Sequence, residues 1–195
     1  MLGQATPAAA GLSARNLGLR TMLRRSAISA LLVLTAGRSV ALYDPRPDDA
    51  LAGVQGEWKG SLTYRDYSKP DRLVTLPTRL FVALSAPNTL VLHFVFDDGP
   101  SKTVFSYEQM TFDFPANQMS WISGSAKRSV DLHTITASTK EGATTTLSFE
   151  KQAEAKTDRY SLLLSSQRLR LIKEEVKASG EVIFRNRYEF IRTGA

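Results

Sequence analysis

The 195-residue chain contains no cysteine and only two histidines, His93 and His133. The absence of cysteine excludes disulfides, thiolate metal sites, a cysteine nucleophile and a lipid-modified cysteine anchor. Without disulfides or a thiolate metal centre, the folded state must be held together by side-chain packing.

Acidic residues are absent from the first 42 positions, which hold five arginines. The rest of the chain therefore carries 20 of the 25 basic residues against all 19 acidic residues, so the net charge of +6 comes mostly from the N-terminus. Nucleic-acid binding needs clustered lysine and arginine to neutralise phosphates. A nearly neutral domain is not expected to bind nucleic acid.

Long apolar runs are also missing. The apolar segment from Ser26 to Ala36 follows the basic start Met22 to Arg25 and precedes the small residues Ser39 to Ala41. Such a run is too short to cross about 30 Å of hydrocarbon and is typical of a cleavable secretory signal. We predict that residues 1–41 are leader and signal peptide, and that the mature protein is periplasmic or secreted without a membrane span.

Two features of this leader stay open. Translation starts either at Met1, which gives an extended leader, or at Met22. The pair Arg24 and Arg25 fits either the basic start of an ordinary secretory signal, which we favour, or a twin-arginine signal.

Helical periodicity is absent from residue 53 onward, where apolar residues alternate with polar ones instead. Before it, residues 42–52 combine two prolines with three aspartates, a composition typical of a solvated linker. We therefore expect one folded domain over residues 53–192.

The alternation predicts about ten short strands with turn signals between them. Antiparallel strands in sequence order leave two exposed edges, and closing the sheet removes both. The predicted fold is all-β, a single up-and-down antiparallel barrel, with a two-sheet β-sandwich as the alternative. The outward positions carry charges such as Lys59, Arg65 and Arg79, which disfavours a barrel embedded in lipid. The expected strands are 58–66, 73–84, 89–96, 103–112, 119–123, 129–137, 144–150, 159–165, 169–177 and 181–192.

The segment Gly56-Glu57-Trp58-Lys59-Gly60 resembles the glycine-x-tryptophan opening of the calycins, which include lipocalins, fatty-acid-binding proteins and nitrobindin-like barrels. In lipocalins this tryptophan closes one end of the barrel beneath an arginine from the last strand region. The resemblance implies that Trp58 and Arg192 form this structural closure, with a cation–π contact between them.

The longer pattern that extends from Gly56 to Tyr64 also resembles the start of nitrobindin-type haem barrels. Those proteins ligate haem iron through a histidine late in the chain, whereas this chain has no histidine after His133. We therefore predict no haem and no other cofactor.

Polar residues at positions that should face the barrel interior mark the candidate ligand site. A barrel of about ten strands is wider than side chains easily fill, and buried polar groups need partners. Asp66 and Asn186 interrupt apolar faces, although each also fits a strand-end residue that caps a backbone group. The predicted cavity residues are Tyr64, Asp66, Phe94, Phe96, Asn186 and Tyr188.

Catalytic and metal-binding patterns are weak. No Gly-x-Ser-x-Gly elbow occurs, neither histidine has a partner that the sequence can place, and the segment Asp97 to Pro100 fits a turn better than a calcium loop. We predict no metal site, no catalytic residue and a barrel that binds a small apolar or amphipathic molecule. The alternatives are an envelope interaction or structural protein with a filled barrel and, third, an enzyme on a calycin scaffold.

Overall fold

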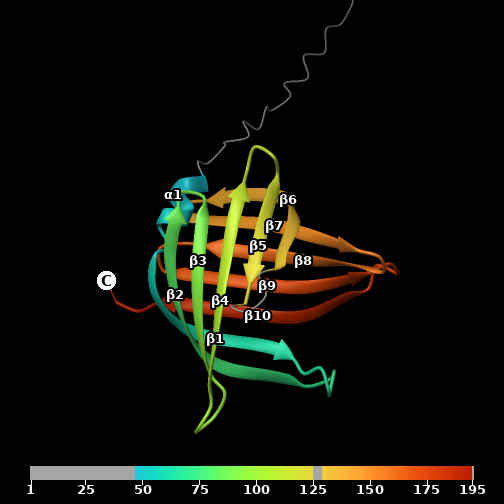
Figure 1. The fold of residues 1–195 in the computed structure, drawn as a ribbon. Helices are drawn as coiled ribbons and strands as arrows, with labels where there is room; N and C mark the ends of the chain where they lie inside the picture. Colours follow the sequence, from blue (N-terminus) through green and yellow to red (C-terminus); the bar gives the residue numbers. More distant parts are fainter. Residues whose placement is uncertain (1–46, 125–128, 195) are drawn as a thin grey trace, which may run out of the picture. The chain divides into compact units, whose positions relative to one another are not determined.

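A computed structural model describes residues 47–124 and 129–194 (Figure 1). The predicted leader, residues 1–41, lies outside the described residues. Within them there is one short helix, α1 (Pro47–Ala52), and no helix that is long and apolar enough to cross a membrane. The remaining elements are strands, whose bounds are β1 (Gly56–Arg65), β2 (Leu73–Ala86), β3 (Thr89–Asp97), β4 (Thr103–Asp113), β5 (Gln118–Ser123), β6 (Ser129–Glu141), β7 (Thr144–Ala153), β8 (Lys156–Leu164), β9 (Arg168–Lys177) and β10 (Val182–Arg192).

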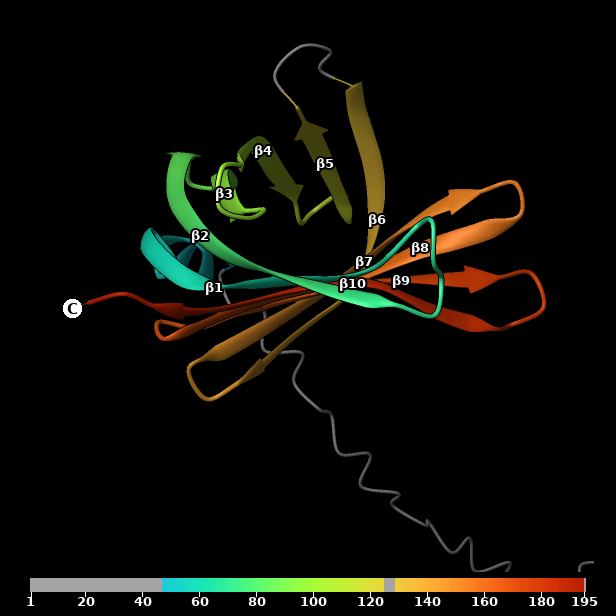
Figure 2. The same cartoon turned by 90° about the horizontal axis from the view of Figure 1, so that it is seen from below.

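The ten strands form one closed antiparallel barrel in which each strand pairs with its neighbours in sequence. The ring closes where β1 pairs with β10, from Trp58 opposite Arg192 to Tyr64 opposite Asn186. Figures 1 and 2 show that strands β3 to β5 run across the direction of the last strands, β8 to β10. The predicted up-and-down barrel is confirmed, and the two-sheet sandwich is wrong.

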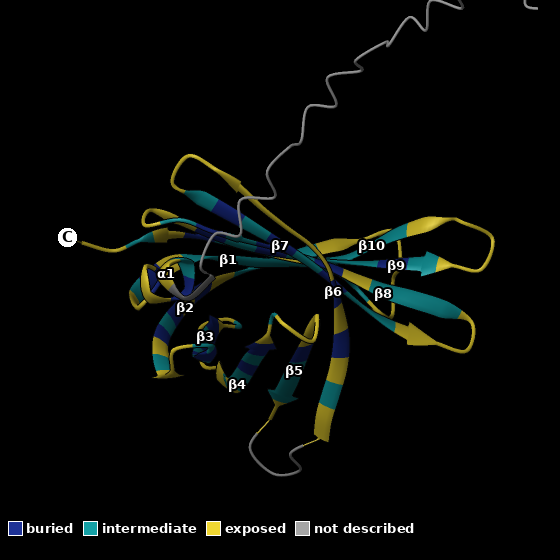
Figure 3. Ribbon diagram, turned by 90° about the horizontal axis from the view of Figure 1, so that it is seen from above, coloured by how far each residue is buried: buried dark blue, intermediate teal, exposed yellow. Residues whose placement is uncertain are grey.

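The strands alternate between buried and exposed residues, as the period of two requires (Figure 3). On β3, for example, Leu90, Leu92 and Phe94 are buried, whereas the valines and His93 between them are only partly buried. Three register shifts interrupt the ladders between the described strands, at Leu84/Ala86 on β2, at Ile135/Ala137 on β6 and at Phe184/Asn186 on β10. Such bulges bend a strand and help a sheet to close.

Helix α1 corrects one expectation from the sequence. Residues 42–52 read as a solvated linker, but Pro47–Ala52 is helical and Leu51 is fully buried. Pro47 is compatible with this because the first turn of a helix does not use its backbone N–H groups. The helix contributes Leu51, and the turn after it contributes Val54, to the same core as Trp58.

Candidate ligand site inside the barrel

The closed end of the barrel is built from Trp58, Arg192 and the segment that follows α1. Trp58 is 0% exposed, and its Nε1–H donates a hydrogen bond to the Val54 carbonyl at 2.9 Å. The guanidinium carbon of Arg192 lies 4.4 Å from the centroid of the Trp58 ring. Arg192 also donates to the carbonyls of Gly53 and Gln55, at 2.6 Å each. The structure thus brings the two predicted closure residues together, and their effect on stability stays a prediction.

Gly60 allows β1 and β10 to approach closely beside this closure. A Cβ atom at Gly60 would lie 1.9 Å from the carbonyl oxygen of Glu189 on β10. No side chain fits at that distance, so glycine at this position is a condition for ring closure.

Above the closed end, an apolar layer fills the barrel. The cavity between these side chains has a volume of about 10 Å³, which is at or below the size needed to hold one water molecule, about 10–15 Å³. This half of the barrel is therefore packed by its own side chains. The residues around that cavity are Leu80, Leu90, Leu92, Phe94, Met110, Leu162, Leu169, Leu171, Tyr188 and Phe190.

Three of the predicted cavity residues lie together at the top of this layer. The ring of Tyr188 on β10 is 5.0 Å from Phe94 and 6.4 Å from Phe96, both on β3. The two phenylalanines are buried, and burial of the Tyr188 hydroxyl raises its pKa well above the ordinary value. These rings therefore form a floor between the filled layer and the rest of the interior.

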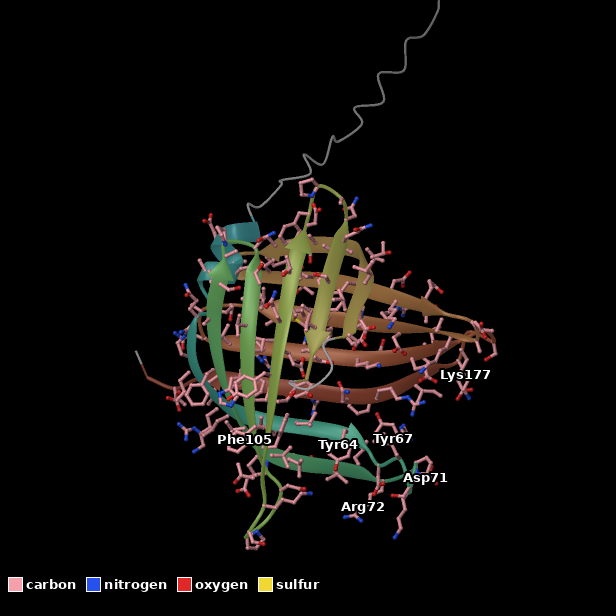
Figure 4. All side chains as sticks on the ribbon, in the orientation of Figure 1. Tyr64, Tyr67, Asp71, Arg72, Phe105 and Lys177 are labelled. Atoms are coloured by element: carbon pink, nitrogen blue, oxygen red, sulfur yellow. The ribbon has the colours of Figure 1, made fainter. Side chains whose placement is uncertain are left out.

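The other predicted residues, Tyr64, Asn186 and Asp66, lie farther from the closed end. Tyr64 and Asn186 are half-buried and face each other across the β1–β10 ladder, and Figure 4 shows Tyr64 at the far end of β1. The Asp66 carboxylate instead accepts hydrogen bonds from the backbone N–H of Ser68, at 2.9 Å, and from its hydroxyl, at 2.7 Å. The structure thus places Asp66 in the β1–β2 turn, in the capping role that was its alternative.

Glu108 on β4 is an interior carboxylate that the sequence analysis did not single out. It shares its face of the strand with the buried residues Met110 and Phe112. Trp121 Nε1–H donates to one Glu108 oxygen at 2.9 Å, and the Ser106 hydroxyl donates to the other at 3.3 Å. Burial raises the pKa of Glu108 above its ordinary value.

Trp121 belongs to a cluster of four packed rings, one from each of the strands β5 to β8. His133 lies 5.8 Å from Trp121, 5.6 Å from Phe149 and 5.2 Å from Tyr160, measured between ring centroids. His133 is 4% exposed, and among the described residues neither of its ring nitrogens has a hydrogen-bond partner of acceptable geometry. Burial lowers the pKa of this histidine, which keeps the ring neutral at pH 7.

The interior carboxylates of β6, β8 and β9 are paired with cations. Asp131 pairs with Lys151 at 2.6 Å, Asp158 with Lys173 at 2.8 Å, and Glu175 with both Lys156 and Arg185 at 2.7 and 2.9 Å. These pairs neutralise the interior carboxylates of β6, β8 and β9. Glu108 has no such cation within the described part of the chain.

His93, in contrast, lies on the outer surface of β3. Its ring stacks on Tyr107 at 4.2 Å, on the opposite side of the wall from the interior residues. Within residues 47–124 and 129–194, no group of three or more histidine, aspartate or glutamate side chains is arranged to hold a metal ion.

No family model matches the chain, and no curated protein matches its sequence. Among solved structures, the crystal structure of Rv2717c from M. tuberculosis is similar to it with a TM-score of 0.55 and 10% identity, over 75% of this chain and 96% of that chain. The S-type phycobiliprotein lyase CPES from Guillardia theta gives a TM-score of 0.52 and 7% identity, over 76% of this chain and 93% of that chain. These likenesses and the closed ten-strand ring fit a calycin-like barrel fold. At these identities the likeness extends to the fold and not to the residues of the site.

Proposed function

We propose that this protein is an exported barrel that binds one small amphipathic molecule, without covalent chemistry, in the half of its interior beyond the Phe94–Tyr188 floor. We call this region the far half; the side chains that define it are Glu108, Trp121, His133, Phe149, Tyr160 and Tyr188. Its aromatic rings offer apolar contact area, and its polar atoms offer the few directional contacts that ligand sites use.

The observation that carries this proposal is the contrast between the two halves of the interior. The half next to Trp58 is filled by apolar side chains, whereas the far half holds a carboxylate that has no cation partner among the described residues and a histidine whose ring nitrogens have no partner of acceptable geometry there. A buried polar group that lacks a partner costs about 1–3 kcal/mol. A barrel whose only task is to fold gains nothing from such groups, but a ligand that bonds to them recovers that cost.

The sequence supports export through the apolar run and small-residue exit that end at Ala41. The test is to express the full chain in a bacterium, isolate the exported protein and analyse it by native mass spectrometry. We expect a bound small molecule at a stoichiometry of about one, retained in an Asp66→Asn control because Asp66 lies in the β1–β2 turn. Protein that carries no ligand and acquires none from a cell extract would refute the binding function.

The outer surface of β2 to β4 favours a second candidate, an interaction protein. Phe105 and Tyr107 are 59% and 51% exposed, and together with Phe81 they surround His93. Exposed apolar patches of this kind mark interaction surfaces in many proteins. If this face is the functional one, Tyr107→Ser abolishes partner capture and leaves ligand binding intact.

A further inference from the structure

The electrostatics of the far half indicate the charge of the molecule that fits there. Of its interior carboxylates, those of Asp131, Asp158 and Glu175 have lysine or arginine partners. Among the described residues, the carboxylate of Glu108 has only neutral donors, the Trp121 indole and the Ser106 hydroxyl. An ionised carboxylate in that setting receives no countercharge from the described part of the chain.

The hydrogen-bonding capacity of Glu108 is not exhausted by these two donors. Each carboxylate oxygen has two lone pairs, and here each oxygen accepts one hydrogen bond. Glu108 can therefore accept two further bonds. An ammonium group supplies donors and the missing positive charge together.

Aromatic rings lie on two sides of this carboxylate. Trp121 donates directly to Glu108, and Tyr188 on the opposite wall is close enough for the Glu108 charge to raise the pKa of its hydroxyl further, beyond the effect of burial. Tyr188 contacts Phe94 at 5.0 Å, and Trp121 contacts Tyr160 at 5.3 Å. The faces of such rings attract cations, most strongly where water is excluded.

His133 is a second, independent feature that points to a ligand. Its ring is more than nine-tenths buried, is neutral and contacts Trp121, and one of its two nitrogens must be an acceptor without a donor. Of cationic, neutral and anionic ligands, a cation with N–H donors supplies both the countercharge for Glu108 and a donor for the acceptor nitrogen of His133. An anion would meet the uncompensated carboxylate of Glu108, while the interior lysines Lys151, Lys156 and Lys173 are already paired with Asp131, Glu175 and Asp158.

We propose, on the basis of the binding function above, that the ligand is a small organic cation: a protonated amine on an apolar body. Its ammonium group binds Glu108, and its apolar body lies against the rings of Trp121 and Tyr188.

The test uses three probes with one phenyl ring and a similar length: 2-phenylethylamine as the cation, 2-phenylethanol as the neutral analogue and 3-phenylpropionate as the anion. Titration calorimetry of the mature protein at pH 7.5 is expected to show at least about tenfold tighter binding of the amine than of the other two. Glu108→Gln keeps the acceptor for Trp121, removes the charge and is expected to reduce amine affinity by about tenfold or more, with the alcohol changed less than about twofold. Glu174→Gln, on the outward-facing side of β9, is the matched control and should leave all three affinities unchanged.

The outcomes separate the two proposals. If a ligand co-purifies but the alcohol or the anion binds as tightly as the amine, the cation proposal is overturned and the binding function stands. If none of the probes binds and no ligand co-purifies, the binding function itself fails. Because the selectivity among probes is measured on the unsubstituted protein, it tests the proposal even if Glu108→Gln does not fold.

Discussion

Removing the side chain of either Trp58 or Arg192 should destabilise the barrel. Removing both should lower the free energy of unfolding by less than the sum of the two single effects. Trp58 is completely buried, so Trp58→Ala loses a large side chain from the core and leaves the Val54 carbonyl without its donor. Substitutions of this kind cost about 3–5 kcal/mol.

The cost of Arg192→Ala follows from four contacts of one guanidinium. It lies over the indole and donates to the carbonyls of Gly53, Gln55 and Ser166. Charge-assisted hydrogen bonds contribute up to about 1.5–3 kcal/mol each, but this group is only half-buried and water replaces part of what is lost. We expect Arg192→Ala to lower the free energy of unfolding by about 2–3 kcal/mol in total, which is more than the loss of a cation–π contact alone would give.

A double-mutant cycle measured by guanidinium chloride unfolding tests the contact itself. Residues in contact are expected to show a coupling free energy of at least about 0.5 kcal/mol. Arg187→Ala serves as the control, because Arg187 lies on the same strand, is exposed and has only a loose ion pair with Glu189 at 3.6 Å. Its effect should stay below about 0.5 kcal/mol. Strict additivity of Trp58→Ala and Arg192→Ala would show that the indole and the guanidinium do not stabilise each other.

Three further predictions concern other parts of the chain. Burial raises the pKa of Glu108, so the contribution of this residue to stability is largest below the ordinary carboxyl pKa and is lost as the pH rises through the raised pKa. Chemical unfolding at pH 4 and pH 8 should therefore show Glu108→Gln to be more stable than the unsubstituted protein only at pH 8. An equal stability difference at both pH values would contradict this. Gly60→Ala should prevent normal pairing of β1 with β10, since the added Cβ would overlap the Glu189 carbonyl, and circular dichroism melting should show a loss of more than about 2 kcal/mol. N-terminal sequencing of the exported protein should give a start near Leu42, whereas a start before Met22 would disprove cleavage of the signal.

Most of the fold follows from local patterns in the sequence. Alternating burial on strands such as β3 is a direct result of the pleat, and the pairing of every strand with its sequence neighbours follows from the short turns between them. Helix α1 could not be predicted from local sequence patterns, because a six-residue helix has little intrinsic stability and depends on burying Leu51 in the barrel core. Its formation is a tertiary effect that a window of sequence does not contain.

The candidate site was only partly predictable, and β4 shows why. Its inward face carries Ser106 and Glu108 before it becomes apolar at Met110, whereas its outward face carries Phe105 and Tyr107. With aromatic residues on the solvent side, alternation alone does not reveal which face points inward. The inward direction is fixed only by pairing with β3, where Phe94 lies opposite Ser106 and is buried.

The cost of Glu108 to the fold is the strongest reason to assign it a role. Its carboxylate is taken out of water without receiving a countercharge from any described residue, and a glutamine would keep the Trp121 hydrogen bond without that cost. A residue that is unfavourable for folding but placed among aromatic rings fits a binding group, because functional sites commonly lower stability. If so, a bound cation should restore what the empty site loses: at 100 times its dissociation constant, the ligand would raise the free energy of unfolding by about 2.7 kcal/mol. At the same concentration, Glu108→Gln, with about tenfold weaker binding, should gain only about 1.4 kcal/mol, and this difference connects the stability of the barrel to its function through one side chain.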